Sequence, residues 1–283
     1  KLNLGSKSGG LRSVLVVFQF AVSIILIVGT IVIYKQLHYI QTKNLGYNKD
    51  QVLVVDGISA LNDNVTPFKN EVLQMPGIVS GTMSSYLPVS NSSRSSNTFS
   101  KESVMTSTDG FVMQDWYIDY DYIKTLGMNI IAGRNFSRDF GGDSNAVIIN
   151  QTAAKILGYP NPIDQKIYQS QDNGKTSALN IIGVVKDFNF ESLHNSIKPL
   201  VLFPEIRGYV MLVKLSGNDL QQTITFLGTK WKELIPHRPF EYHFLDEDFN
   251  KTYSSELRLG KVLTIFASIA SALASLGLLG LSS

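Results

Sequence analysis

Residues Val14 to Ile33 read VLVVFQFAVSIILIVGTIVI, a stretch of twenty residues without a charged side chain. Only Gln19, Ser23, Thr30 and one glycine interrupt its apolar character. A helix of about twenty apolar residues spans the roughly 30 Å hydrocarbon core of a bilayer. A cleaved signal peptide would need a shorter apolar run and a small-residue cleavage site, and neither precedes Tyr34. The stretch therefore predicts a transmembrane helix.

A second uncharged block lies near the other end of the chain, where Val262 to Leu281 reads VLTIFASIASALASLGLLGL. Small side chains recur at every fourth residue and beside that row: Ala267, Ser271, Ser275, Ser268 and Ala272. Such a ridge lets another helix approach closely in lipid, although small residues are also common in membrane helices generally. We expect a second transmembrane helix that belongs to a multi-helix bundle.

Both helices are expected to continue beyond the membrane as stalks. No proline or glycine follows the first block until Gly46, so Leu11 to Leu45 is predicted to form one helix about 52 Å long. Asp246 is placed to cap a helix that runs without a breaker to Gly260 and on into the second block. Lysine and arginine are almost balanced around the spans, so charge does not set their orientation.

The middle of the chain has the pattern of a soluble α+β domain. Two β-α-β units are predicted from apolar periodicity and turn residues: strand 51–56, helix 65–75 and a strand from Ile78; then strand 209–215, N-cap Asn218, helix 219–234 and strand 240–245. Two such units predict a ferredoxin-like split β-α-β subdomain, here interrupted by an insert between Pro88 and Arg207.

The insert is predicted to be a second, mixed α/β subdomain. It begins with serines that have too few apolar neighbours to pack, which predicts a mobile surface loop: Ser90, Ser92, Ser93, Ser95, Ser96 and Ser100. Further elements are expected along it: strand 111–118, a short helix near 120–126, strand 146–149, helix 151–157 ended by Gly158, and a hairpin turning at 172–174 toward 179–185.

These patterns predict three parts of the chain, and the orientation given to them follows from the length of the middle segment and from the family resemblance described below. Residues 1–45 hold a cytoplasmic flank, the first transmembrane helix and its stalk. Residues 46–245 form the extracytoplasmic domain, with the split subdomain at 46–87 plus 208–245 and the insert at 88–207. Residues 246–283 hold the second stalk and transmembrane helix. The predicted fold class is therefore an α+β extracytoplasmic domain between two long helices.

Composition excludes several classes of function. A net charge of +2, with lysines and arginines scattered singly, gives no basic stripe for nucleic acid. The chain contains no cysteine, which removes disulfides, thiolate catalysis and cysteine metal sites. Hydrophobic residues make up 44% of the chain and charged residues 17%, more apolar than a typical soluble domain, and the excess lies in the two terminal blocks.

No catalytic, cofactor-binding or metal site emerges from the motifs. Gly5 to Gly10 has the glycine spacing of a phosphate loop, but Leu11 and Arg12 stand where lysine and serine or threonine are required. Four histidines lack zinc-ligand spacing and are expected to be surface or packing residues: His38, His194, His237 and His243.

One acidic stretch partly matches a calcium loop. Asp246, Asp248 and Asn250 have the spacing of its opening, but Lys251 replaces the required glycine and Leu257 the bidentate glutamate. We therefore interpret this stretch as the capped, solvated start of a helix.

Several blocks together resemble MacB/FtsX-like ABC transporter permeases. They are LRSVLVVFQFAVSIILI from Leu11, LHYIQTKNLGYNKDQVLVV from Leu37, YIDYDYIKTLGMNIIAGRNF from Tyr117, AVIINQTAAKILGYPNPID from Ala146, IIGVVKDFNF from Ile181 and FEYHFLDEDFNKTYSSELRLG from Phe240. The resemblance covers nearly the whole chain and is more specific than any single motif.

The resemblance implies a non-catalytic permease subunit in the bacterial inner membrane, with its central domain in the periplasm. It implies a separate cytoplasmic ABC ATPase, further transmembrane helices that this sequence lacks, a dimeric or two-half assembly, and a periplasmic adaptor as a further partner. Relatives of this kind serve efflux, lipoprotein or peptide export, or mechanotransmission, so the substrate does not follow from the fold.

Two other functions stay open. A membrane-anchored sensor or binding module would use the same two helices to relay ligand binding, and it predicts a cytoplasmic signalling domain. A membrane-tethered enzyme is the weakest alternative, because no nucleophile, acid-base pair or metal cluster can be assembled from the motifs.

Overall fold

The computed structural model describes residues 8–89, 94–105, 110–140, 145–171, 175–205, 210–216 and 220–282, with side chains at the two ends described from Val14 to Gly277. The chain divides into two compact units. The helical unit is Lys1–Lys43 with Tyr253–Ser283, and the α/β unit is Asn44–Thr252. Three predicted features fall outside the described residues: the first half of the glycine run at 5–10, the turn at 172–174 and the N-cap Asn218.

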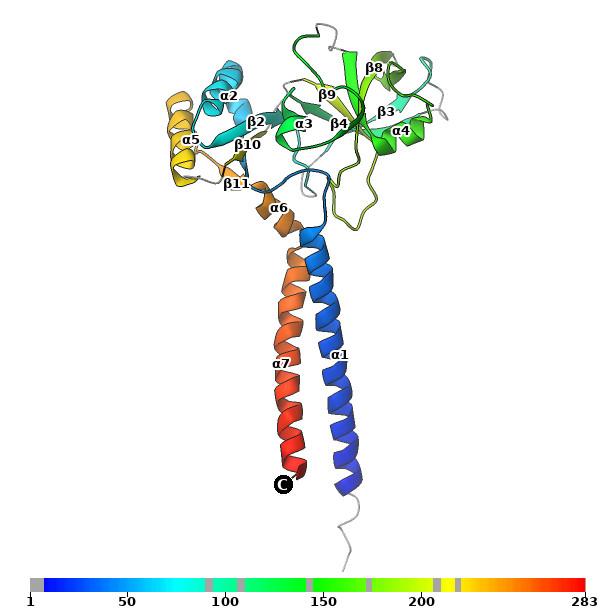
Figure 1. The fold of residues 1–283 in the computed structure, drawn as a ribbon, viewed down its shortest axis with the longest axis vertical. Helices are drawn as coiled ribbons and strands as arrows, with labels where there is room; N and C mark the ends of the chain where they lie inside the picture. Colours follow the sequence, from blue (N-terminus) through cyan, green and yellow to red (C-terminus); the bar gives the residue numbers. More distant parts are fainter. Residues whose placement is uncertain are drawn as a thin grey trace, which may run out of the picture. The chain divides into compact units, whose positions relative to one another are not determined.

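The helical unit consists of α1 (Ser8–Thr42) and α7 (Ser254–Ser282), which lie side by side (Figure 1). They run antiparallel, because Gln19 lies near Gly277 whereas Leu37 lies near Gly260. The predicted first helix is three residues too long at its end: α1 stops at Thr42, and Leu45 and Tyr47 are buried in the α/β unit instead.

The prediction that the second stalk is one continuous helix is wrong. α6 (Leu245–Thr252) and α7 are separate, with Tyr253 between them. No proline or glycine marks this interruption, so local sequence gives no sign of it. Asp246 also lies in the first turn of α6 rather than at its cap.

The first part of the α/β unit is built from two β-α-β segments. One contains β1 (Val52–Asp56), the 3-10 helix η1 (Ile58–Asn64), α2 (Val65–Leu73) and β2 (Ile78–Ser84). The other contains β10 (Val210–Leu215), α5 (Leu220–Leu234) and β11 (Tyr242–Phe244). Their strands lie in the order β11-β1-β10-β2, and all neighbours are antiparallel. The predicted last strand is shorter than expected, because Leu245 already begins α6.

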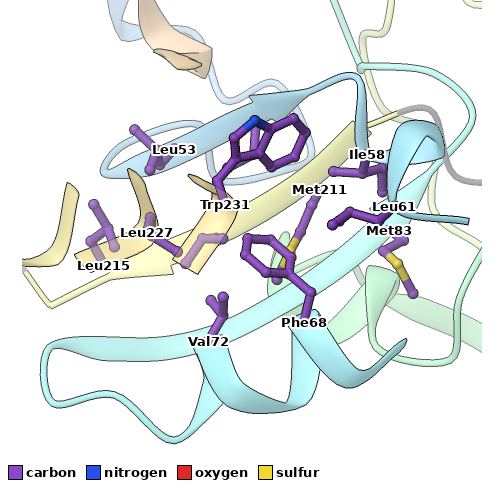
Figure 2. Packing of buried hydrophobic residues seen from close by; sticks show 12 residues of the cluster. Leu53, Ile58, Leu61, Phe68, Val72, Met83, Met211, Leu215, Leu227 and Trp231 are labelled. Atoms are coloured by element: carbon purple, nitrogen blue, oxygen red, sulfur yellow. The ribbon is translucent and has the colours of Figure 1, made fainter. Parts of the chain in front are cut away.

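One apolar core joins α2 and α5 to a single face of these strands (Figure 1). Phe68 of α2 meets Trp231 of α5 edge to face, with ring centroids 6.1 Å apart (Figure 2). Leu53 and Met211 from the strands complete the contact. The opposite face is buried as well, since α3 (Tyr122–Thr125) contacts β2 and α6 contacts β1.

The insert closes a ring of strands. Its strands are β3 (Ser96–Ser100), β4 (Phe111–Ile118), β6 (Ala146–Asn150), β7 (Lys166–Ser170), β8 (Thr176–Val185) and β9 (Leu200–Pro204). They pair in the order β4-β3-β7-β8-β6-β9, and β9 pairs again with β4. A short strand, β5 (Ile130–Gly133), pairs with β8, and α4 (Gln151–Leu157) packs on the ring core.

The predicted serine-rich loop is corrected over its second half. Residues 90–93 lie outside the described part, but Ser96–Ser100 is β3, paired with both β4 and β7. Phe99 is fully buried and supplies the one apolar anchor the segment has, and Ser100 is buried beside it. Strand pairing therefore orders a segment whose composition alone predicts a loop. The strands β5 and β9 and the helix η1 were not predicted.

Candidate functional site: the helix pair and the segments that anchor it

The seam between α1 and α7 follows a regular spacing. Less exposed residues of α1 recur at alternating steps of three and four: Val16, Gln19, Ser23, Leu26, Thr30, Ile33, Leu37 and Ile40. α7 repeats the pattern: Gly260, Leu263, Ala267, Ala270, Ala274 and Gly277. This is the a/d spacing of a coiled coil, which keeps one face of each helix toward the other over many turns.

Small residues of α7 bring the two backbones close. Ala267 and Ala274 are buried, and a Cβ on Gly260 would lie 3.2 Å from a methyl carbon of Leu37. Ser23 donates to the carbonyl of Gln19 at 2.8 Å and lies 3.5 Å from the carbonyl of Ala270. The seam is therefore narrow and partly polar, as expected for helices that associate in lipid.

The predicted small-residue ridge is only partly used by α1. Ala267 lies in the seam, but Ser268, Ala272 and Ser275 are exposed on other faces of α7. Ser268 and Ser275 each donate to the carbonyl four residues earlier in their own helix. The seam uses residues seven apart on α7, because the partner helix follows it lengthwise instead of crossing it at one point.

Large apolar side chains make up much of the exposed surface of both helices. Val17, Ile25 and Leu276 are each more than 60% exposed within the structure. Both helices are long and apolar enough to cross a membrane. Exposed apolar surface of this extent is unfavourable in water and favourable in lipid.

Within the α/β unit, the segment 44–51 that follows α1 is held by the insert. The amide of Asn189 donates to the carbonyl of Leu45 at 2.7 Å, and the amide of Asn48 donates to the carbonyl of Leu126 at 2.8 Å. Gly46 adopts φ +86 and lies against Phe188, where an added Cβ would approach within 2.8 Å. The predicted role of Gly46 as a helix stop is thus replaced by a packing role.

The segment before α7 packs against the part of the α/β unit that is built from the two β-α-β segments, which we call the split part. α6 buries Leu245 and Phe249, and the ammonium of Lys49 lies 5.2 Å from the ring centre of Phe249. His243 of β11 lies between two carboxylates, with Nδ1 2.9 Å from Asp56 and Nε2 2.5 Å from Asp248. Sequence spacing gave no sign of this cluster, because its three members meet only through the pairing of β11 with β1.

The remaining predicted candidates do not converge. Asp246, Asp248 and Asn250 lie in the helix α6 rather than in a loop, and Asp248 pairs with Lys251 at 3.0 Å. His237 is exposed, whereas His243 is part of the cluster above. Among the described residues, no three His, Asp or Glu side chains are grouped so that they could hold a metal ion.

These features define a class of protein: a mixed α/β domain flanked by two apolar helices of membrane-spanning length. Residues 13–227, well over half of the chain, match the family model described as the MacB-like periplasmic core domain. The chain belongs to this family, which confirms the predicted resemblance to MacB/FtsX-like permeases, and it is a membrane protein with an extracytoplasmic domain.

One solved structure supports the assignment at the level of the fold. The periplasmic region of MacB from Actinobacillus actinomycetemcomitans matches with a TM-score of 0.50 and 16% identity, over 73% of this chain and 94% of that one. The extracellular domain of the noncanonic ABC-type transporter YknZ from Gram-positive bacteria matches with a TM-score of 0.45 and 14% identity, over 71% and 90%. Among curated proteins, none matches the chain.

Proposed function

We propose that this chain is part of the permease subunit of an ABC transporter in the bacterial inner membrane. A separate cytoplasmic ATPase binds and hydrolyses ATP, and the helix pair α1 and α7 transmits the resulting movement to the extracytoplasmic domain. The observation that carries this proposal is the pair itself: two membrane-length helices share one continuous seam, and their chain ends enter the same α/β unit at residues 44 and 252.

The proposal includes a division of the extracytoplasmic domain. Residues 46–87 plus 208–245 form a ferredoxin-like split β-α-β subdomain, supported by the strand order β11-β1-β10-β2 and by both helices packing on one face. Residues 88–207 form the inserted subdomain, supported by the closed strand ring and its own core.

The chain acts through its partners rather than through chemistry of its own. It requires the ATPase, the remaining transmembrane helices in a dimeric or two-half assembly, and a periplasmic adaptor where the output is export. Movement of the α/β unit then drives efflux, lipoprotein or peptide export, or mechanical control of another protein.

Spin labels test this transmission. The chain has no cysteine, so Gln41→Cys on α1 and Ser254→Cys on α7 give one labelled pair in the intact complex with its ATPase. The distance between the two labels is expected to change between the ATP-bound and nucleotide-free states. Phe18→Cys with Gln41→Cys is the control, because both positions lie on α1 and should keep their separation. A constant distance between α1 and α7 in both states would reject transmission by this pair.

A second candidate function is a membrane-anchored sensor or binding module. It is favoured by a groove of about 480 Å³ between α2 and α5, lined by Glu71, Gln74, Met75, Pro76, Gln222, Thr223 and Phe226. Purification of the full-length protein with its partners separates the two functions. An associated ATPase supports the permease, whereas a cytoplasmic signalling domain supports the sensor.

A further inference from the structure

The cluster around His243 joins three elements of the α/β unit. His243 belongs to β11, Asp56 ends β1, and Asp248 lies in the first turn of α6. The imidazole side chain is only 21% exposed, and each of its ring nitrogens faces a carboxylate oxygen, at 2.9 Å for Asp56 and 2.5 Å for Asp248. α6 leads within one residue to α7, so this cluster lies where the chain leaves the sheet toward a membrane helix.

The geometry selects the charged form of the imidazole. A neutral histidine carries one N–H, so one of its nitrogens would present a lone pair to a carboxylate. Nε2 is buried and is not aligned for a hydrogen bond with Asp248, so its contact with that carboxylate is an ion pair, which only the imidazolium forms. The hydrogen bond with Asp56 raises the pKa of His243 above its ordinary value of 6.5; burial opposes this, and the charges of Asp248 and Asp56 add to it.

Other charged groups lie near the cluster. On α6, the ammonium of Lys251 lies 3.0 Å from the second oxygen of Asp248. This hydrogen bond raises the pKa of Lys251, and the charges of Glu247 and Asp56 add to the effect. Beyond β1, the guanidinium of Arg238 approaches Gly57, and the amide of Asp56 donates to the carbonyl of Glu241. A neutral imidazole can keep its one proton on Nδ1 for Asp56, so loss of the histidine charge weakens mainly the contact with Asp248, and with it the link to α6.

α6 depends on such a link. It has eight residues, fewer than an isolated helix needs to be stable in water. Its buried apolar side chains are Leu245 at its start and Phe249 in its middle. The ion pairs of His243 add to these two apolar contacts in holding α6 to the sheet.

We propose that His243 is a pH-sensitive tie that fastens α6 to β1 when protonated and releases it when neutral. The raised pKa makes the stabilisation complete below about pH 6.5, and it is lost as the pH rises through the higher value of the folded protein. An alkaline exterior thus loosens the base of α7. The inference extends the proposed function, in which this base transmits movement, but the tie itself does not require transport.

Hydrogen exchange measured on the full chain in detergent or nanodiscs tests the tie. Amide exchange of a peptide covering 245–252 is followed from pH 6 to pH 9 and corrected for the intrinsic rate at each pH. Protection is expected to fall severalfold at the alkaline end in the native protein. His243→Gln should show low protection at every pH. His237→Gln, at an exposed histidine, should keep the native pH profile of α6. The peptide that covers α4, measured in the same spectra, should show protection that does not change with pH.

Two results would overturn the proposal. One is protection of α6 that stays constant with pH in the native chain, and the other is an equal pH profile in His243→Gln. If that variant does not fold, titration of 13C-labelled histidine in the native chain decides: His243 should titrate above 6.5, and a value at or below 6.5 rejects the tie. If the protection of α6 depends on pH but the complex shows no transport, the proposed function is refuted and the pH-sensitive tie is not.

Discussion

The ammonium of Lys69 lies 2.6 Å from a carboxylate oxygen of Asp119, and both side chains are almost completely buried. Lys69 is on α2 in the split part, whereas Asp119 directly follows β4 of the insert. Asp119 also accepts hydrogen bonds from the hydroxyl of Thr82 and from the amide of Met83 at 2.9 Å. A buried, fully bonded carboxylate thus joins the two parts where β2 and β4 meet at Ser84 and Ile118.

Lys69→Met should destabilise the protein by about 3–5 kcal/mol, because removal of one partner leaves a buried charge unpaired. Methionine keeps most of the side-chain volume, so lost packing contributes little. Thermal or urea unfolding of the purified chain measures the change. Lys230→Met is the control, since Lys230 pairs with Glu71 and Glu233 at the surface and should not change the unfolding midpoint measurably. Equal midpoints for both variants would contradict the structural role of Lys69.

Gly46→Ala should destabilise the protein by at least about 2 kcal/mol, since it combines a left-handed backbone with a steric clash. The new Cβ would lie 2.8 Å from the Cβ of Phe188 and 2.9 Å from the carbonyl oxygen of Asp187. Gly127→Ala separates the two effects: its φ is +64, but a Cβ there meets nothing closer than 3.9 Å. That variant should lose only about 1–2 kcal/mol. Equal losses by unfolding would show that Phe188 can move away.

A disulfide should form between Ser23→Cys and Ala270→Cys in the membrane-embedded chain. Ser23 faces the backbone of Ala270 across the seam, and the native chain has no cysteine to compete. Oxidation followed by gel mobility or mass spectrometry detects the cross-link. Ser23→Cys with Ser268→Cys is the matched control and should stay reduced, because Ser268 is on an exposed face of α7. Efficient cross-linking of the control would place the seam elsewhere.

The carboxylate of Glu191 should make the protein lose stability in acid. Burial acts to raise its pKa, but hydrogen bonds from Lys198, Asn195 and Gln114 outweigh this and lower the pKa below the ordinary value of 4.5. A lowered pKa stabilises the folded state above 4.5, and the contribution is lost as the pH falls through the lower value. The unfolding midpoint of Glu191→Gln should therefore fall less steeply below pH 5 than that of the native chain. Glu71→Gln, at an exposed carboxylate, should keep the native profile.

Elements with strong local signals were predicted closely. α4 begins and ends where expected, since Asn150 caps it by accepting from the amide of Ala153 and Gly158 ends it with φ +63. The strands β1, β2, β4 and β10 also follow their apolar runs. β3 and β9 were missed for different reasons. β3 has one apolar anchor and exists because other strands pair with it, whereas β9 had a local signal that the prediction did not use: the apolar run from Leu200 to Phe203, which lies between Pro199 and Pro204.

The charged clusters within the α/β unit could not be predicted from the sequence. His243, Asp56 and Asp248 have no sequence spacing that marks a site, and Lys69 and Asp119 are separated by fifty residues. Such groups become visible only when strand register and helix packing bring them together. The interruption at Tyr253 belongs to the same category, because the residues around it favour a continuous helix.

The sequence by itself determined the two membrane helices, the mixed α/β character of the domain between them and the family to which the chain belongs. Each of these follows from uninterrupted apolar runs or from several separate matching blocks, which need no knowledge of contacts. Tertiary structure alone decided the face on which α1 and α7 meet, the closure of the strand ring and the charge clusters that hold its parts. Those features depend on distances between residues far apart in the chain, and local propensity carries no information about such distances.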